Sequence, residues 1–122
     1  MTEEQKLARA HLIGSAVDNR RAHPRVAGPF DGWRLGLLDT PVSIFDLSIG
    51  GCFVNSTHVQ QPGQVIKLKI DVPDEGWIRV KAQTLNRQRE LGYAVRFVEI
   101  SDVDARRLDR AIRRMIGDSD EV

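Results

Sequence analysis

Two neighbouring segments in which every second residue is apolar constrain the fold most strongly. In residues 65–72 and 77–85, apolar side chains alternate with mainly charged or polar ones. A period of two predicts strands that turn one face to a core and the other to water. The alternating inward positions are Ile66, Leu68, Ile70, Ile78, Val80, Ala82 and Thr84.

Four more short runs are rich in Val, Ile, Phe, Leu and Trp, and turn-type residues separate them all. No segment between the runs is long enough for a helical crossover, which favours antiparallel pairing over a parallel sheet. We therefore predict a mainly β fold, a six-stranded antiparallel barrel over residues 30–100. Trp33 and Trp77 are expected to anchor its wall or core. For Trp77, which follows the turn "PDEG", the alternative is an exposed side chain that binds a partner. The further runs are "WRLGLLDT", "PVSIFDLS", "GCFVN" and "YAVRFVEI".

The two ends of the chain differ from this middle part. Residues 101–117 are predicted to form a C-terminal helix, with Ser101 as its cap and Gly117 at its end. A polar tail (118–122) follows it. Residues 1–17 are expected to form an extension with a short helix. Such a helix is marginal alone, so that it either docks, on its own barrel or on a second protomer, or frays. Residues 18–29, with two prolines and a glycine, are expected to form a linker.

Composition excludes several classes of function. The net charge is only +1, so an anion site requires local clustering of cations. The three histidines lack metal-ligand spacing, and no nucleophile has a positioned base, so neither a metal site, a cofactor nor an enzyme is expected. The one cysteine, Cys52, starts a core strand and is expected to be a buried, inert thiol. No run is apolar enough to span a membrane and the N-terminus does not resemble a signal peptide, so we expect a cytoplasmic location.

Two polar stretches stand out against this framework. In "DLSIGG" (46–51), Asp46 and Ser48 would share a face if the preceding strand continued. The alternative is a turn in which both side chains bond the local backbone. In "RRAHPR", Arg21 and Arg25 offer two planar forks suited to phosphate oxygens or a guanine edge, although a solvated linker is the simpler interpretation.

Taken together, these stretches resemble the R-x-x-x-R and D-x-S-x-x-G signature of the PilZ family. The resemblance covers residues 20 to about 116. It implies a six-stranded, split, Greek-key-like barrel with a following helix, so that the domain spans residues 18–117. "LGYAVRF" (91–97) is similar to the family's late-strand pattern, with Ala94 where a second glycine is usual.

The resemblance implies a receptor for the bacterial second messenger cyclic di-GMP. The arginines would contact phosphates and guanine edges, and the Asp46 carboxylate would accept hydrogen bonds from guanine N–H donors. The linker (18–29), which we call the arginine arm, would be loose without ligand and would order upon binding. Arg20, directly before the pair, implies a self-intercalated ligand dimer, hence two ligands per protomer. The implied binding residues are Arg20, Arg21, Arg25, Asp46, Ser48, Gly50, Gly51 and Gly92.

Two other functions compete with this interpretation. One is a small β-barrel that binds nucleic acid, although no aromatic–basic interleaving on one strand face is evident from the sequence. The other is a structural barrel that keeps the motif without binding. A one-domain receptor would act as an adaptor for an unidentified protein in motility, biofilm, exopolysaccharide or virulence control. Homodimerisation remains open.

Overall fold

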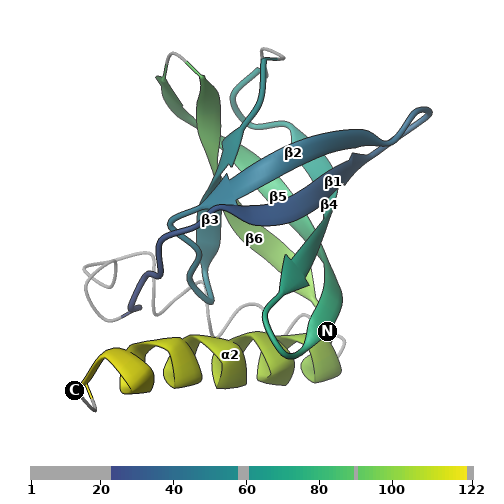
Figure 1. Ribbon diagram of the computed structural model, residues 1–122. Coiled ribbons are helices and arrows are strands. Elements are labelled where there is room, and N and C mark those ends of the chain that lie inside the picture. The colour runs from purple at the N-terminus through teal and green to yellow at the C-terminus, as the bar shows by residue number, and fades with distance from the viewer. Residues whose placement is uncertain (1–22, 58–60, 90, 121–122) are drawn as a thin grey trace.

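A computed structural model describes residues 23–57, 61–89 and 91–120, without the side chains of 87–89 and 118–120. Six strands are followed by one helix (Figure 1). The expected N-terminal helix and the arginines Arg20 and Arg21 lie outside the described residues. The elements are β1 (Phe30–Leu35), β2 (Thr40–Phe45), β3 (Gly51–Asn55), β4 (Val65–Val72), β5 (Gly76–Arg89), β6 (Gly92–Ile100) and α2 (Asp102–Asp120).

The strands close into a barrel in the order β1-β2-β3-β6-β5-β4, with every neighbouring pair antiparallel. The predicted fold class is therefore confirmed. Closure occurs between β1 and β4, where Trp33 lies opposite Lys69. Closure removes the exposed sheet edges that an open antiparallel sheet would leave.

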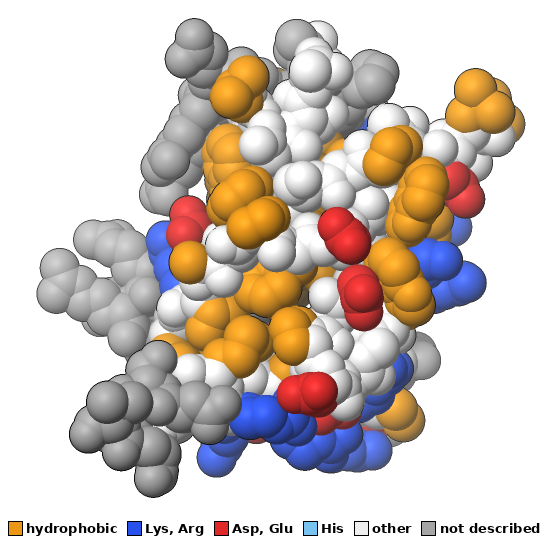
Figure 2. Space-filling model, in the orientation of Figure 1, with side chains coloured by type: hydrophobic (Ala, Val, Ile, Leu, Met, Phe, Trp, Pro, Cys, Tyr) orange, Lys and Arg blue, Asp and Glu red, His pale blue; other side chains and the backbone are white. Residues whose placement is uncertain are grey.

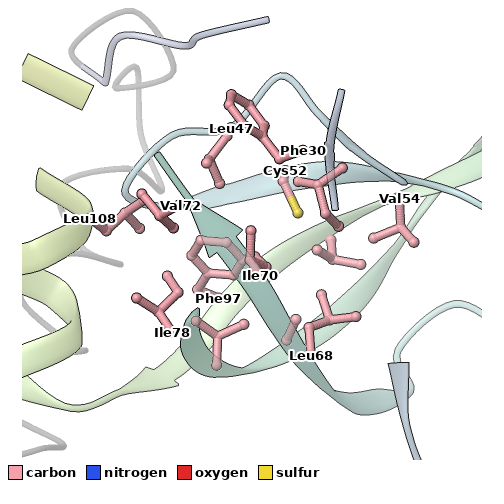
Figure 3. Packing of buried hydrophobic residues seen from close by; sticks show 14 of the residues in the cluster. Phe30, Leu47, Cys52, Val54, Leu68, Ile70, Val72, Ile78, Phe97 and Leu108 are labelled. Carbon is pink, nitrogen blue, oxygen red and sulfur yellow. The ribbon is translucent and has the colours of Figure 1, made fainter. Parts of the chain in front are cut away.

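Apolar side chains fill the barrel as the alternation predicted (Figure 3). Leu68, Ile70 and Ile78 are fully buried, whereas Lys67 and Arg79 beside them are exposed. Thr84 continues the inward series, and its hydroxyl accepts a hydrogen bond of 2.9 Å from the Gln64 amide. A polar inward position is thus satisfied, as burial requires.

The helix α2 closes one end of the barrel (Figure 1). Leu108, Ala111 and Ile112 on its apolar side belong to the core cluster. The Ser101 hydroxyl accepts a hydrogen bond of 3.1 Å from the Asp104 amide, which confirms the predicted cap.

Polar contacts between α2 and the β4–β5 turn converge on Glu75. Arg110 holds its carboxylate with two hydrogen bonds, of 2.9 and 2.7 Å, and Arg114 adds a third of 2.8 Å. Arg107 donates to the Glu75 backbone carbonyl. The hydrogen bonds from Arg110, and to a lesser extent that from Arg114, lower the pKa of Glu75 from 4.5 to about 2.

Three expectations about the elements differ from the structure. α2 passes through Gly117 to Asp120, because nothing there forces a left-handed stop. β5 extends to Arg89, over residues expected to form a turn. Trp33 and Trp77 are 36% and 40% exposed on the outer face, since their strand positions alternate with the inward ones. Among the described helices, none is long and apolar enough to cross a membrane.

Candidate ligand-binding site

A short segment before β1 is fastened directly to the motif loop, residues 46–51. Val26 and Leu47 exchange two backbone hydrogen bonds of 2.9 Å each. Val26 packs against the core cluster, and the neighbouring Arg25 is exposed. The arm was expected to be loose without ligand. At Val26, apolar packing and backbone pairing connect the arm to the barrel.

The motif loop turns Asp46 and Ser48 in different directions. β2 ends at Phe45, and Asp46 adopts a left-handed backbone conformation with φ of 51°. Its side chain is exposed, whereas Ser48 is only 7% exposed. The expectation that Asp46 and Ser48 share one face of a continuing strand is therefore wrong. Aspartate tolerates this conformation better than most side chains, which explains how the chain can leave the strand here.

The Ser48 hydroxyl holds the loop together. It accepts hydrogen bonds from the amides of Gly50 (3.1 Å) and Gly51 (3.2 Å), and it donates to the Gly51 carbonyl at 3.3 Å. The Gly50 carbonyl in turn accepts a hydrogen bond of 2.8 Å from the Phe97 amide of β6. The alternative in which the side chain bonds the local backbone thus describes Ser48, and these hydrogen bonds tie the part of the loop that follows Asp46 together.

Two of the predicted site glycines are required by the barrel itself. A Cβ on Gly51 would overlap with the Val95 carbonyl oxygen of β6, and a Cβ on Gly92 would overlap with the Val54 carbonyl oxygen of β3. Both lie where β3 and β6 approach closely. Their lack of a side chain therefore permits this strand pairing.

Arg96 is a candidate residue that sequence reasoning missed. It lies opposite both Gly51 on β3 and Gln83 on β5, on the outward side of the barrel. One guanidinium nitrogen donates a 2.7 Å hydrogen bond to the Gln83 side-chain oxygen. Its Nε is buried and has no hydrogen-bond partner within the described chain. A signal was present in the sequence, because Arg96 alternates with the inward Val95 and Phe97.

Beneath the loop, Cys52 is 6% exposed, as expected. Burial raises the pKa of its thiol well above the usual range, and the negative charge of Asp46 raises it further. The thiol is therefore protonated and inert at neutral pH. The described residues contain no cluster of His, Cys, Asp or Glu that could hold a metal ion.

A cleft of about 420 Å³ separates the motif loop from α2. Ile49 of the loop lines one side, and Ala105, Arg106 and Asp109 of the helix line the other. The loop thus adjoins the helix as well as the arm.

The comparisons with known proteins agree with this architecture. Escherichia coli YcgR in complex with c-di-GMP matches with a TM-score of 0.67 and 23% identity, over 84% of this chain and 48% of that one. Bacillus subtilis MotI/DgrA, an inhibitor of motility, matches with a TM-score of 0.65 and 22% identity, over 80% of this chain and 52% of its own. This chain thus spans about half the length of these two proteins.

A third solved structure, the PilZ domain of E. coli YcgR with c-di-GMP, matches with a TM-score of 0.62 and 19% identity, over 84% of this chain and 99% of that one. No curated protein matches the chain significantly. The PilZ domain family matches residues 19–114, which include the arginine arm, the barrel and most of α2. The chain therefore belongs to the PilZ domain family.

Proposed function

We propose that this chain binds c-di-GMP on the outer surface formed by the arginine arm and the motif loop. The bridge between Val26 and Leu47 is the observation that carries the proposal, because it brings Arg25 and Asp46 onto adjoining segments. Both side chains are exposed there. A cationic fork and an acceptor-only carboxylate are thus both open to solvent on segments that pair with each other, and this combination suits a ligand with phosphates and guanines.

Each group has a distinct role in this proposal. Arg21 and Arg25 contact phosphates and guanine O6/N7 edges, and Asp46 accepts from guanine N1–H and N2–H. Ser48 is a positioning residue, since its hydroxyl already bonds the amides of Gly50 and Gly51. Gly51 and Gly92 act by allowing the strand approach that supports the loop. Arg96, with a buried and unpartnered Nε in the described structure, adds a fork from the barrel wall.

Binding is proposed to act as a switch rather than a reaction. The ligand's two negative charges offset the crowding of cations on the arm, so that the arm closes over the ligand. The new surface then serves a protein partner in the cytoplasm, in motility, exopolysaccharide, biofilm or virulence control. MotI, described as an inhibitor of motility, is one structural neighbour compatible with such an output.

Nucleic-acid binding is the second candidate, and one observation favours it. Contrary to the sequence-based expectation, Trp33 lies opposite Lys69 and Lys69 lies 5.0 Å from the ring centre of Trp77, all on the outer face. This arrangement interleaves aromatic and basic groups. Lys69 already lies over the Trp77 ring, however, which leaves less of that ring for a base.

Calorimetric titration of the chain with c-di-GMP tests the proposal, with cyclic di-AMP and a single-stranded oligonucleotide as controls. We expect the chain to bind c-di-GMP and neither of the two controls. Equal binding of cyclic di-AMP would contradict guanine recognition by Asp46. Binding of the oligonucleotide without c-di-GMP would support the nucleic-acid candidate instead.

A further inference from the structure

The turn between β1 and β2 forms a protruding tip with two leucines that contact almost nothing. Leu37 is 107% exposed and Leu38 is 84% exposed, the two highest values among the exposed large hydrophobic side chains of the described chain. We call residues 36–39 the prong. Figure 2 shows hydrophobic side chains projecting from the surface at the end of this hairpin. Such exposure of adjacent large apolar side chains is unfavourable in water and commonly marks a binding element.

Basic residues flank the prong on the neighbouring strand. Lys67 lies opposite Leu35, and Lys69 lies opposite Trp33. Lys67 is thus paired with the last residue of β1, two residues before Leu37, and Lys69 is paired with Trp33, four residues before Leu37. Cations and a tryptophan thus stand at successive depths behind an apolar tip.

The prong also satisfies part of its own backbone. The Gly36 amide donates to the Asp39 carboxylate at 3.2 Å, and the Thr40 hydroxyl donates to the Leu38 carbonyl at 3.5 Å. Internal hydrogen bonds reduce the cost of moving a turn out of water. Asp39 is the acidic group of the prong and directly precedes β2.

We propose that the prong inserts into the surface of an anionic lipid membrane. An apolar tip that enters about 5–10 Å below the headgroups would place Lys67 among the lipid phosphates. Trp33 would lie at the outer boundary, where its amphipathic ring is favoured. Leucines offer a nucleic acid no stacking surface, which disfavours that partner. A protruding tip with cations set back behind it fits a soft, layered surface better than a flat acidic protein face.

The prong and the candidate c-di-GMP site lie at opposite ends of β2. Thr40 begins that strand beside the prong, and Phe45 ends it beside Asp46. A membrane-bound chain would therefore keep its motif loop and α2 in water. The proposal is independent of c-di-GMP binding, since it concerns a different surface of the domain.

Vesicle flotation with the full chain tests this proposal. The two vesicle types contain either equal parts of phosphatidylglycerol and phosphatidylcholine, or phosphatidylcholine alone. We expect the chain to float with the anionic vesicles only. The floating fraction should decrease with added salt, because salt screens the contacts between lysines and lipid phosphates. The double variant Leu37→Ser/Leu38→Ser should lower the partition coefficient about tenfold or more. Lys67→Gln should lower it about fivefold.

Matched controls distinguish binding through the prong from nonspecific binding of exposed apolar or cationic side chains to vesicles. Leu91→Ser removes a leucine that is 59% exposed at another turn, and Arg113→Gln removes an exposed cation on α2. Both variants should float like the unaltered chain. Retained c-di-GMP binding and unfolding midpoint in the prong variants would show that they are folded.

A second readout uses the tryptophan nearest the prong. In a Trp77→Phe variant, Trp33 emission should shift to shorter wavelength when anionic vesicles are added. The proposal is overturned if the unaltered chain does not float, if Leu91→Ser lowers flotation as much as the prong variant, or if the Trp33 emission does not shift.

Discussion

Val26 and Leu47 join the arginine arm to the motif loop by two backbone hydrogen bonds of 2.9 Å. This bridge means that Arg25 stands beside the loop before any ligand arrives. Less conformational entropy is then lost on binding than for an arm that is wholly unattached. The part of the arm that responds to ligand is expected to lie N-terminal to the bridge at Val26.

Ser48→Ala should lower both stability and affinity. The substitution leaves the amides of Gly50 and Gly51 without their shared acceptor, which costs about 1–3 kcal/mol. Urea unfolding measures the stability, and Ser48→Thr, which keeps the hydroxyl, serves as the conservative variant. If Ser48→Ala weakens c-di-GMP binding with no loss of stability, Ser48 is a direct contact rather than a positioning residue.

Gly51→Ala should destabilise the chain by about 1–3 kcal/mol, because the methyl group meets the Val95 carbonyl of the paired strand. Gly117→Ala is the matched control. A Cβ there meets nothing within 4 Å, and the residue lies inside α2, so alanine should stabilise the helix by roughly 0.5–1 kcal/mol. Both changes are read from urea unfolding midpoints. Equal effects of the two substitutions would refute the close approach at Gly51.

Glu75 links stability to pH through its lowered pKa. Between pH 4.5 and about 2, the unfolded chain protonates Glu75 while the folded chain keeps it ionised. The stability that Glu75 contributes is therefore complete above pH 4.5 and is lost as the pH falls toward 2. The difference in unfolding free energy between the unaltered chain and Glu75→Gln should shrink over this window. A difference that is independent of pH would contradict the arginine contacts.

Arg20 predicts the number of bound ligands. If it recognises a stacked ligand dimer, calorimetry should give two c-di-GMP per protomer for the unaltered chain and one for Arg20→Leu. One-to-one binding by both chains would remove this role from Arg20 while leaving the main site intact.

The strand positions were predictable because alternation is a local signal. Ile66 to Thr84 followed the period of two, and the inward or outward side of each position followed with it. The side of Asp46 was not predictable, since it depends on a left-handed residue at the end of β2. The roles of Gly51 and Glu75 arise from partners far along the chain, Val95 on β6 and the arginines of α2, so no local pattern reveals them.

Trp33 and Trp77 illustrate a different limit. Their size suggested burial, but strand parity placed them outside, and parity was the more reliable guide. The same parity would have marked Arg96 as outward, although its position opposite Gly51 depends on the pairing of β6 with β3.

The central claim is that Arg25 and Asp46 form one c-di-GMP site, and calorimetric titration of matched variants tests it most directly. Asp46→Gly removes the carboxylate while accepting the positive φ, and Arg25→Ala removes an exposed fork. Lys67→Ala on β4 removes an exposed cation across the barrel as a control. We predict that Asp46→Gly and Arg25→Ala each weaken binding by about 1.5–3 kcal/mol, roughly 10- to 150-fold, with ligand-free unfolding midpoints and the Lys67→Ala affinity unchanged. Equal affinity in all four proteins would contradict the claim.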